Sequence, residues 1–162
     1  MARPESAREA AASASTSKFV GFTLGKEEYA VDILKVKEIK LMLAITRVPK
    51  APMFVEGVIN LRGEIIPIID LRKKLSLSVS AQTEDSRIIV VELDERLVGI
   101  IVDSVSEVLE LPEDKISPPP PIVAGIEAEY LRGVGRLGDR LLILLDLDKI
   151  LTVQEKTDLK RV

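Results

Sequence analysis

Apolar and polar residues alternate in short runs separated by turn-forming residues, a pattern typical of a protein built from strands. Every second residue from 29 to 33 is apolar, and residues 19–24 form another strand-like run before them. The residues between these runs, 25–28, have the sequence Gly-Lys-Glu-Glu and predict a hairpin turn. After residue 33 the apolar spacing lengthens to three, through Val36 and Ile39. This change of period predicts a single helical or irregular turn.

One longer pattern occurs twice, because the stretch 57–71 recurs without a gap at 133–147. The matched positions, 76 residues apart, include Gly57 and Gly133, Leu61 and Leu137, Ile65 and Leu141, Ile68 and Leu144, and Asp70 and Asp146. A second set of matches, 69 residues apart, relates residues 20–39 to residues 89–108. We therefore interpret the chain as an internal duplication.

Turn and cap signals divide each copy into short elements. Arg62-Gly63-Glu64 is expected to form a tight turn between two strands. Pro67 has no N–H to donate, so its strand should be an edge strand there or carry a bulge. Asp70 is expected to cap a short helix over residues 71–75, and Asp146 repeats it. Further strands are predicted at 46–48, 87–93, 97–102 and 140–145.

The polar segment 76–86 marks the break between two similar halves. We expect a mostly β fold of two small barrels, each of about five short strands, with short helices and a shallow apolar groove between the barrels. The proline run 118–121 should be an extended surface crossing. The predicted boundaries are a disordered tail over 1–17, a first barrel over about 19–80 that chain crossings complete, a second barrel over about 86–151, and a C-terminal helix over about 147–160.

Composition narrows the chemistry that this fold can carry. The 162-residue chain is 46% hydrophobic but only 3% aromatic, so its core must consist of Val, Ile and Leu. It has no His and no Cys, which excludes a histidine base, a thiol nucleophile and the usual zinc sites. Net charge is −3, with basic and acidic residues interspersed, which argues against a nucleic-acid surface. No apolar run reaches the ~20 residues of a membrane span, so we expect a soluble intracellular protein.

Two motif-like strings have simpler structural interpretations. Residues 133–138 satisfy the pattern GxGxxG, but a strand follows them where a dinucleotide site needs a helix. Asp146 and Asp148 could hold a metal ion, yet Asp146 repeats a helix cap and Arg72 stands at the position matching Asp148. We therefore expect turn and cap chemistry at both places. The acids in the predicted turns converge on no common point, which argues against a carboxylate-dependent enzyme.

Gly57 and Arg62 differ in whether the second copy of the repeat has the same residue. Gly57 is retained as Gly133, which indicates a backbone that needs positive φ or close approach. Arg62 corresponds to Gly138, so the repeat does not require an arginine there for folding. Two interpretations of Arg62 stay open, a solvated turn residue and a binding residue.

Several of these strings together resemble the CheW family of bacterial chemotaxis coupling proteins. In the first half the strings are Phe22-Thr23-Leu24-Gly25, Val31-Asp32-Ile33-Leu34-Lys35-Val36, Asn60-Leu61-Arg62-Gly63 and Asp70-Leu71-Arg72. In the second half they are Val98-Gly99-Ile100, Tyr130-Leu131 and Leu137-Gly138-Asp139-Arg140. The resemblance covers about residues 19–151.

This resemblance implies two SH3-like five-stranded barrels and a non-enzymatic adaptor without a cofactor or metal. Such an adaptor links the signalling tips of methyl-accepting chemoreceptors to the regulatory domain of the histidine kinase CheA. It would be cytoplasmic, gathered with receptor clusters at the inner face of the membrane, and could contact other copies of itself in arrays. An RNA-binding module is the rival hypothesis, although the acidic chain has few aromatic residues for stacking.

The resemblance also implies two sets of binding residues. The receptor-binding candidates are Val36, Ile39, Arg62, Val98, Ile100, Val102 and Val105. The kinase-binding candidates are Ile45, Val48, Gly57, Ile59 and Ile122. Relatives often carry an aromatic residue where Ile122 stands, so this sequence departs from the family pattern in the proline-containing crossing.

Overall fold

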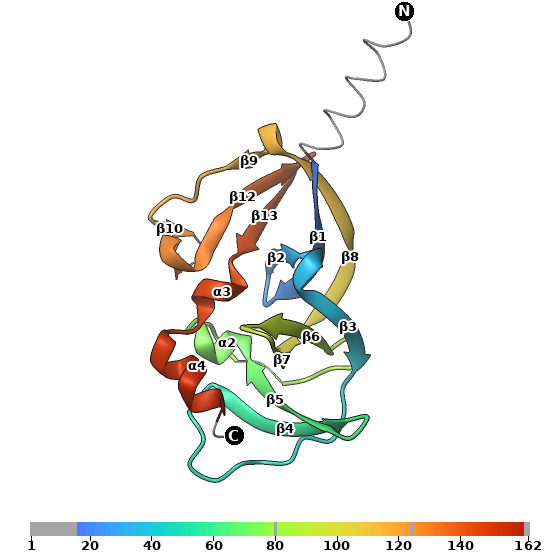
Figure 1. Cartoon of the computed structure of the whole chain (residues 1–162). Coiled ribbons are helices and arrows are strands. Elements are labelled where there is room, and N and C mark those ends of the chain that lie inside the picture. The colour runs from blue at the N-terminus through green and yellow to red at the C-terminus, as the bar shows by residue number, and fades with distance from the viewer. Residues whose placement is uncertain (1–15, 80, 124, 161–162) are drawn as a thin grey trace, which may run out of the picture.

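A computed structural model describes residues 16–79, 81–123 and 125–160 and shows two main sheets that pack face to face (Figure 1). The six-stranded sheet has the order β8 (Ser104–Pro112), β1 (Thr16–Leu24), β2 (Glu27–Asp32), β13 (Arg140–Leu145), β12 (Leu131–Leu137) and β9 (Ile116–Ser117). The five-stranded sheet has the order β3 (Val36–Leu41), β6 (Arg87–Leu93), β7 (Arg96–Val102), β5 (Glu64–Asp70) and β4 (Val55–Leu61). A small hairpin joins β10 (Ile122–Val123) to β11 (Ile126–Glu127).

Helical segments are short and connect the strands. They are η1 (Ile33–Lys35), α2 (Leu71–Lys74), η2 (Glu113–Lys115), η3 (Ala128–Tyr130), α3 (Leu147–Ile150) and α4 (Val153–Lys160). The prediction of a mostly β fold with short helices is therefore confirmed. None of the described helices is long and apolar enough to cross a membrane.

Each main sheet combines strands from both sequence halves, so neither sheet is built from residues 19–80 or 86–151 alone. β13 pairs in parallel with β2, while β6 and β7 follow the polar break yet lie beside β3 and β5. The exchange has a physical reason. β6 is apolar on both faces and is therefore buried, so its backbone N–H and C=O groups cannot bond to water and need a paired strand on each side. Among the described residues, backbone pairing does not close either sheet into a barrel.

Three apolar layers account for the burial of both sheets. The largest lies between the sheets and receives side chains such as Tyr29, Ile89 and Ile143. A second layer, with Ile88, lies on the far side of the five-stranded sheet, and a third, with Phe19, lies on the far side of the six-stranded sheet. Successive residues of one strand therefore enter different layers, which explains the continuous apolar runs in the sequence.

The predicted turn through Val36 and Ile39 is mostly a strand. Only η1 is helical, and β3 then pairs antiparallel with β6. The register shifts between Val36, opposite Val91, and Glu38, opposite Val90. This bulge inserts one residue, so apolar residues spaced by three lie on the same face of the strand.

The predicted C-terminal helix is two helices, because the chain is extended at Leu151 (φ −107°, ψ 138°). Thr152 and Glu155 then start α4 as a capping box. The Thr152 N–H donates to Glu155 Oε1 at 2.8 Å, and the Glu155 N–H donates to Thr152 Oγ1 at 3.1 Å. At the other end of the chain β1 already begins at Thr16, earlier than predicted. The rest of the predicted tail, residues 1–15, lies outside the described residues.

The duplication is confirmed at the helix caps. Asp70 accepts a hydrogen bond from the Arg72 N–H at 3.0 Å, and Asp146 accepts one from the Asp148 N–H at 3.1 Å. The Asp70 and Asp146 N–H groups donate to the carbonyls of Phe54 and Tyr130, which are themselves 76 positions apart, at 2.9 Å in both cases. Pro67 also lies as predicted, because β5 pairs with β7 only from Ile68 onward.

Lys74 lies between these two equivalent aromatic residues. Its Nζ is 5.7 Å from the centre of the Phe54 ring and 5.6 Å from that of Tyr130. It also pairs with Glu155 of α4 at 3.1 Å. The half-buried Lys74 cation thus links the segments before β4 and β12 to the last helix, α4.

Gly57 shows why the repeat retains a glycine. The segment before it forms a backbone bridge, in which the Thr46 N–H donates to the Val58 carbonyl at 2.9 Å and the Val58 N–H donates to the Thr46 carbonyl at 2.8 Å. A Cβ on Gly57 would lie 2.2 Å from the Thr46 carbonyl oxygen, and its φ of +150° is unfavourable for other residues. Gly133 has the same constraint, since its Cβ would lie 2.6 Å from the Ser117 carbonyl oxygen.

Gly57→Ala is expected to lower the free energy of unfolding by about 2 kcal/mol or more, because both the clash and the backbone conformation oppose a side chain. Urea denaturation measures this change. Gly25→Asn is the control: Gly25 also has positive φ but open space around it, and Asn tolerates this conformation, so the loss should stay below about 1 kcal/mol. Equal losses in both variants would contradict the close-approach explanation.

Candidate partner-binding surface

The predicted receptor-binding residues do not all lie on the surface. Val98, Ile100 and Val102 are buried and belong to the layer between the sheets. Their strand, β7, is central in its sheet, and the three side chains pack between the two sheets. In this structure these three side chains are therefore not exposed to a partner.

The predicted kinase-binding residues divide in the same way. Ile59 is buried inside the five-stranded sheet, and Gly57 is buried against the Thr46 backbone, so neither offers a side chain to a partner. Ile45 and Val48 are half-buried in the segment that leads to β4, where Met53 is exposed. Ile122 is exposed at the start of β10.

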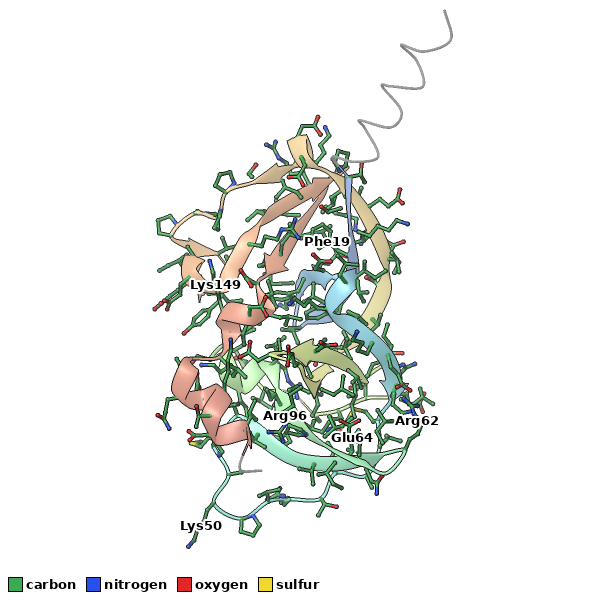
Figure 2. All side chains as sticks on the ribbon, in the orientation of Figure 1. Phe19, Lys50, Arg62, Glu64, Arg96 and Lys149 are labelled. Atoms are coloured by element: carbon green, nitrogen blue, oxygen red, sulfur yellow. The ribbon has the colours of Figure 1, made fainter. Side chains whose placement is uncertain are left out.

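Four receptor-binding candidates reach the surface, three of them on edge strands and the fourth in a turn. Ile39 is exposed on β3, while Val36 on β3 and Val105 on β8 are half-buried against the layer between the sheets. β3 and β8 are outer strands of their respective sheets and run along the same side of the molecule in Figure 1. Arg62 projects from the β4–β5 turn near β3, as Figure 2 shows.

The turn that carries Arg62 is well determined by its sequence. Arg62 (φ 51°) and Gly63 (φ 86°) both have positive φ, as expected for a two-residue hairpin turn of type I′. The Asn60 side chain supports the turn by accepting the Gly63 N–H at 2.8 Å. The guanidinium then reaches β3, where Nη1 donates to Glu38 Oε1 at 3.2 Å and Nη2 to Glu38 Oε2 at 2.8 Å.

This two-pronged ion pair joins the β4–β5 turn to β3, which is the opposite edge of the same sheet. Arg62 therefore has a structural partner that the comparison of the two copies did not reveal. Its side chain nevertheless remains 70% exposed, against 25% for Glu38, so its outer face is free to contact a partner.

The ion pair controls the titration of Glu38. The hydrogen bonds from Arg62, followed by that from Lys40 Nζ at 3.1 Å, lower the pKa of Glu38 from 4.5 to about 2. The same pairing raises the pKa of the Arg62 guanidinium. Both charges are therefore fixed at neutral pH.

The site prediction missed several exposed apolar residues on the strands. Leu41 lies on β3, Ile65 on β5, Val108 on β8 and Leu141 on β13. The repeat contained a signal for one of them, because Val108 corresponds to the candidate Ile39.

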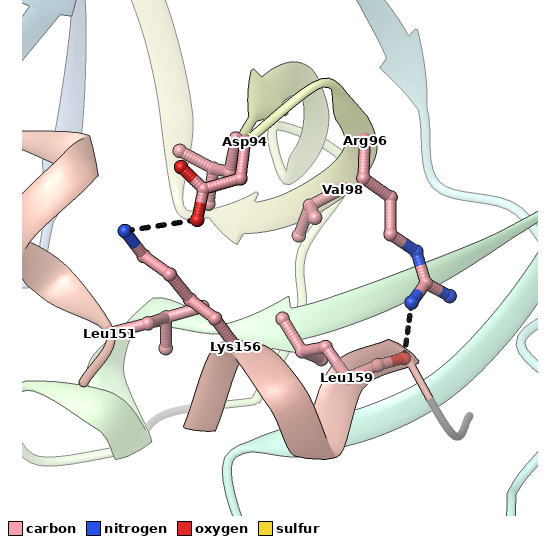
Figure 3. A pocket seen from close by; sticks show the side chains of 7 residues that line it. Asp94, Arg96, Val98, Leu151, Lys156 and Leu159 are labelled. Carbon is pink, nitrogen blue, oxygen red and sulfur yellow. Dashed lines mark hydrogen bonds and ion pairs between the residues drawn. The ribbon is translucent and has the colours of Figure 1, made fainter. Parts of the chain in front are cut away.

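One small pocket has a structural explanation. It lies between the β6–β7 turn and α4 and is lined by Leu93, Asp94, Arg96, Val98, Leu151, Lys156 and Leu159 (Figure 3). Lys156 pairs with Asp94 at 3.3 Å, and Arg96 Nη1 donates to the Leu159 carbonyl at 2.5 Å. Its charged groups therefore hold α4 in place. Within the described ranges, no three acidic side chains gather to form a metal site.

Comparisons with known proteins agree on one family. A family model described as the CheW-like domain matches residues 18–155. The chemotaxis protein CheW of Klebsiella aerogenes is 47% identical over 138 residues, covering 85% of this chain and 83% of that protein. CheW of Helicobacter pylori is 37% identical over 134 residues, covering 83% and 81%. The crystal structure of the scaffolding protein TtCheW from Thermoanaerobacter tengcongensis has a TM-score of 0.79 and 40% identity, covering 86% of this chain and 90% of that one.

We predict that the Glu38 carboxyl titrates near pH 2, which NMR of its side-chain carbon measures directly. Because the folded pKa lies below the unfolded value of 4.5, the ion pair stabilises the fold above about pH 4.5, and this stabilisation is lost as the pH falls toward 2. Arg62→Gln should raise the pKa toward 4.5. Lys40→Gln, the control, should raise it less. A wild-type midpoint near 4.5 would contradict the ion pair.

Proposed function

Because this chain belongs to the family defined by the CheW-like domain, we propose that it is a non-enzymatic adaptor that couples methyl-accepting chemoreceptors to the histidine kinase CheA in bacterial chemotaxis. The family match extends over almost all of both sheets. The scaffolding title of the structural relative, at 40% identity, supports the same role. We also propose that each sheet is an open SH3-like barrel and that the protein works in the cytoplasm beneath receptor clusters.

The observation that carries the receptor contact is that Ile39 and Arg62 are exposed, while Val36 and Val105 are half-buried against the layer between the sheets. A receptor signalling tip is a helical hairpin, and an apolar stripe on one of its helices would pack against these residues. Arg62 would supply the charged contact at the edge. The contribution of Val98, Ile100 and Val102 would be indirect, because these buried side chains support the strands that carry this surface.

The kinase contact has two proposed parts. Ile45 and Val48 would meet the kinase regulatory domain through the segment that precedes β4, whose path depends on Gly57 and Ile59. Ile122 would meet it at the β10–β11 hairpin. Contacts between copies of the adaptor in arrays would likewise use exposed apolar residues.

The mechanism is geometric. Two sheets that share one packed core form a stiff spacer between the proposed receptor surface and the proposed kinase surfaces. A receptor signal would pass as a small shift of these interfaces, and each moderate contact gains strength from being one of several in an assembly.

Arg62→Glu should abolish pull-down of this protein by a receptor signalling-tip fragment, because the partner-facing charge is reversed. The thermal transition should move by only a few degrees, since the lost ion pair is largely exposed. Arg136→Glu is the matched control, because Arg136 is an exposed arginine on β12, which belongs to the other sheet. Unchanged pull-down by Arg62→Glu would remove the receptor contact from this surface.

Ile122→Ser should weaken binding to the kinase regulatory domain several-fold, because it removes an exposed apolar side chain from the proposed contact. Receptor binding and the melting temperature should stay the same. Val79→Ser provides the control at an apolar residue of similar exposure in the 76–86 segment. Surface plasmon resonance measures both affinities, and equal effects of the two variants would argue against a kinase contact at Ile122.

A further inference from the structure

The chain crosses between the two sheets at two points that the duplication makes equivalent. η1 joins β2 of the six-stranded sheet to β3 of the five-stranded sheet, and Asp103 joins β7 to β8 in the reverse direction. The shift of 69 matches Leu34 of η1 to Asp103. Leu34 faces the β6–β7 turn, which stands at the other end of β7 from Asp103. Because the seven residues of β7 span roughly 20 Å, the two crossings lie at opposite ends of the layer between the sheets.

A buried charge network holds the sheets together at the Asp103 end. Asp103 Oδ2 accepts the N–H of Gly25 in the β1–β2 turn, and the Asp103 N–H donates to the Thr23 carbonyl at 3.0 Å. Asp103 Oδ1 accepts Arg72 Nη1 at 3.0 Å, and Arg72 also pairs with Asp70 at 3.1 Å. The side chains of Arg72 and Asp70 are both 4% exposed. Separating the sheets here would leave buried charges unpaired, so the network strongly opposes it.

The equivalent contacts at the η1 end are weaker. Leu34 takes the place of Asp103 and has no carboxylate to bind the turn opposite. It is 82% exposed and, together with the β6–β7 turn, lines an open groove of about 580 Å³. Asp148 of α3 takes the place of Arg72 and pairs with Lys35 at 3.1 Å, but these two side chains are 48% and 40% exposed. Water screens such a pair, which therefore opposes separation only weakly.

We propose that the two sheets pivot about the Asp103 end while the groove at the η1 end opens and closes, and that this pivot sets the activity of the bound kinase. The packed layer between the sheets limits the motion to a small rotation. The Lys35–Asp148 pair holds the closed arrangement and breaks as the groove widens. The difference in strength between the two ends thus gives the adaptor one fixed hinge and one movable side.

This inference rests on the proposed function and specifies the movement that carries a receptor signal. The two proposed kinase contacts belong to different sheets. Ile45 and Val48 precede β4 of the five-stranded sheet, whereas Ile122 follows β9 of the six-stranded sheet. Rotation of one sheet on the other therefore changes the spacing between these contacts. A receptor that favours one spacing biases the kinase toward the state that fits it.

Double electron–electron resonance between two spin labels measures the motion at each end. The chain has no cysteine, so labels attach only where cysteine is introduced. Glu95→Cys with Lys149→Cys spans the η1 end, and Lys26→Cys with Lys73→Cys spans the Asp103 end; all four residues are exposed, and Figure 2 labels Lys149. The distribution of label distances should be about twice as wide at the η1 end. A chemoreceptor signalling-tip fragment should shift that distribution alone.

Lys35→Gln should widen the distribution at the η1 end further, because the pair with Asp148 is lost. It should also change receptor control of kinase autophosphorylation. The matched control is Lys37→Gln, which removes an equally exposed pair with Glu92. That pair joins β3 to β6 within one sheet, so its loss should alter neither measurement.

The double variant Leu34→Asp with Asp94→Gly makes the opposite change, because it copies the contact between Asp103 and Gly25 to the η1 end. It should narrow the distribution there and reduce receptor control of the kinase about threefold, while the affinities for receptor and kinase stay the same. Asp94→Gly alone is the control, since it loses only the ion pair with Lys156.

Three results would count against these assignments. Equal distance distributions at the two ends, unchanged by the receptor fragment, would overturn the pivot. Narrowing by the double variant without any loss of receptor control would overturn the signalling role of the pivot and leave the proposed function intact. A wild-type protein that binds neither the receptor fragment nor the kinase would overturn the proposed function and the signalling role together, and the label distances would still decide the pivot.

Discussion

The apolar layer between the two sheets is the constraint on which the rest of the structure depends. It takes side chains from β1, β2 and β13 on one side and from β5, β6 and β7 on the other. Neither sheet could leave this face in water, so the two sheets must fold as one unit. The exchange of strands between sequence halves follows, because the duplicated segments complete each other's sheets.

This arrangement leaves the outer strands as the places where a partner can bind. β3 and β8 each have a free edge, and free edges must be protected from unwanted pairing. The arginine bridges Arg62–Glu38 and Arg140–Glu107 place charged side chains there and hold the strands in position. The same charged residues thus protect an edge from unwanted strand pairing and offer a specific partner a charged contact there. In this way the fold supports the proposed adaptor role.

Local features could be predicted from the sequence, and features that depend on distant contacts could not. The turn at Arg62, the caps at Asp70 and Asp146 and the strand over 140–145 each depend on neighbouring residues alone. The bulge after Val36 spaces apolar residues by three, so the sequence of β3 resembles that of a helical turn. The Thr152–Glu155 capping box starts a separate last helix that the sequence prediction did not include. The burial of Val98 and the pairing of Arg62 with Glu38, 24 positions apart, are set by how the sheets assemble.

Co-sedimentation of the kinase CheA with membranes or vesicles that display a chemoreceptor signalling fragment tests the adaptor role most directly. With this protein present, the kinase should enter the pellet and its autophosphorylation rate should change. Without it, the kinase should stay in the supernatant. Kinase that reaches the pellet equally well in both cases, or an adaptor that pellets while the kinase does not, would contradict the account.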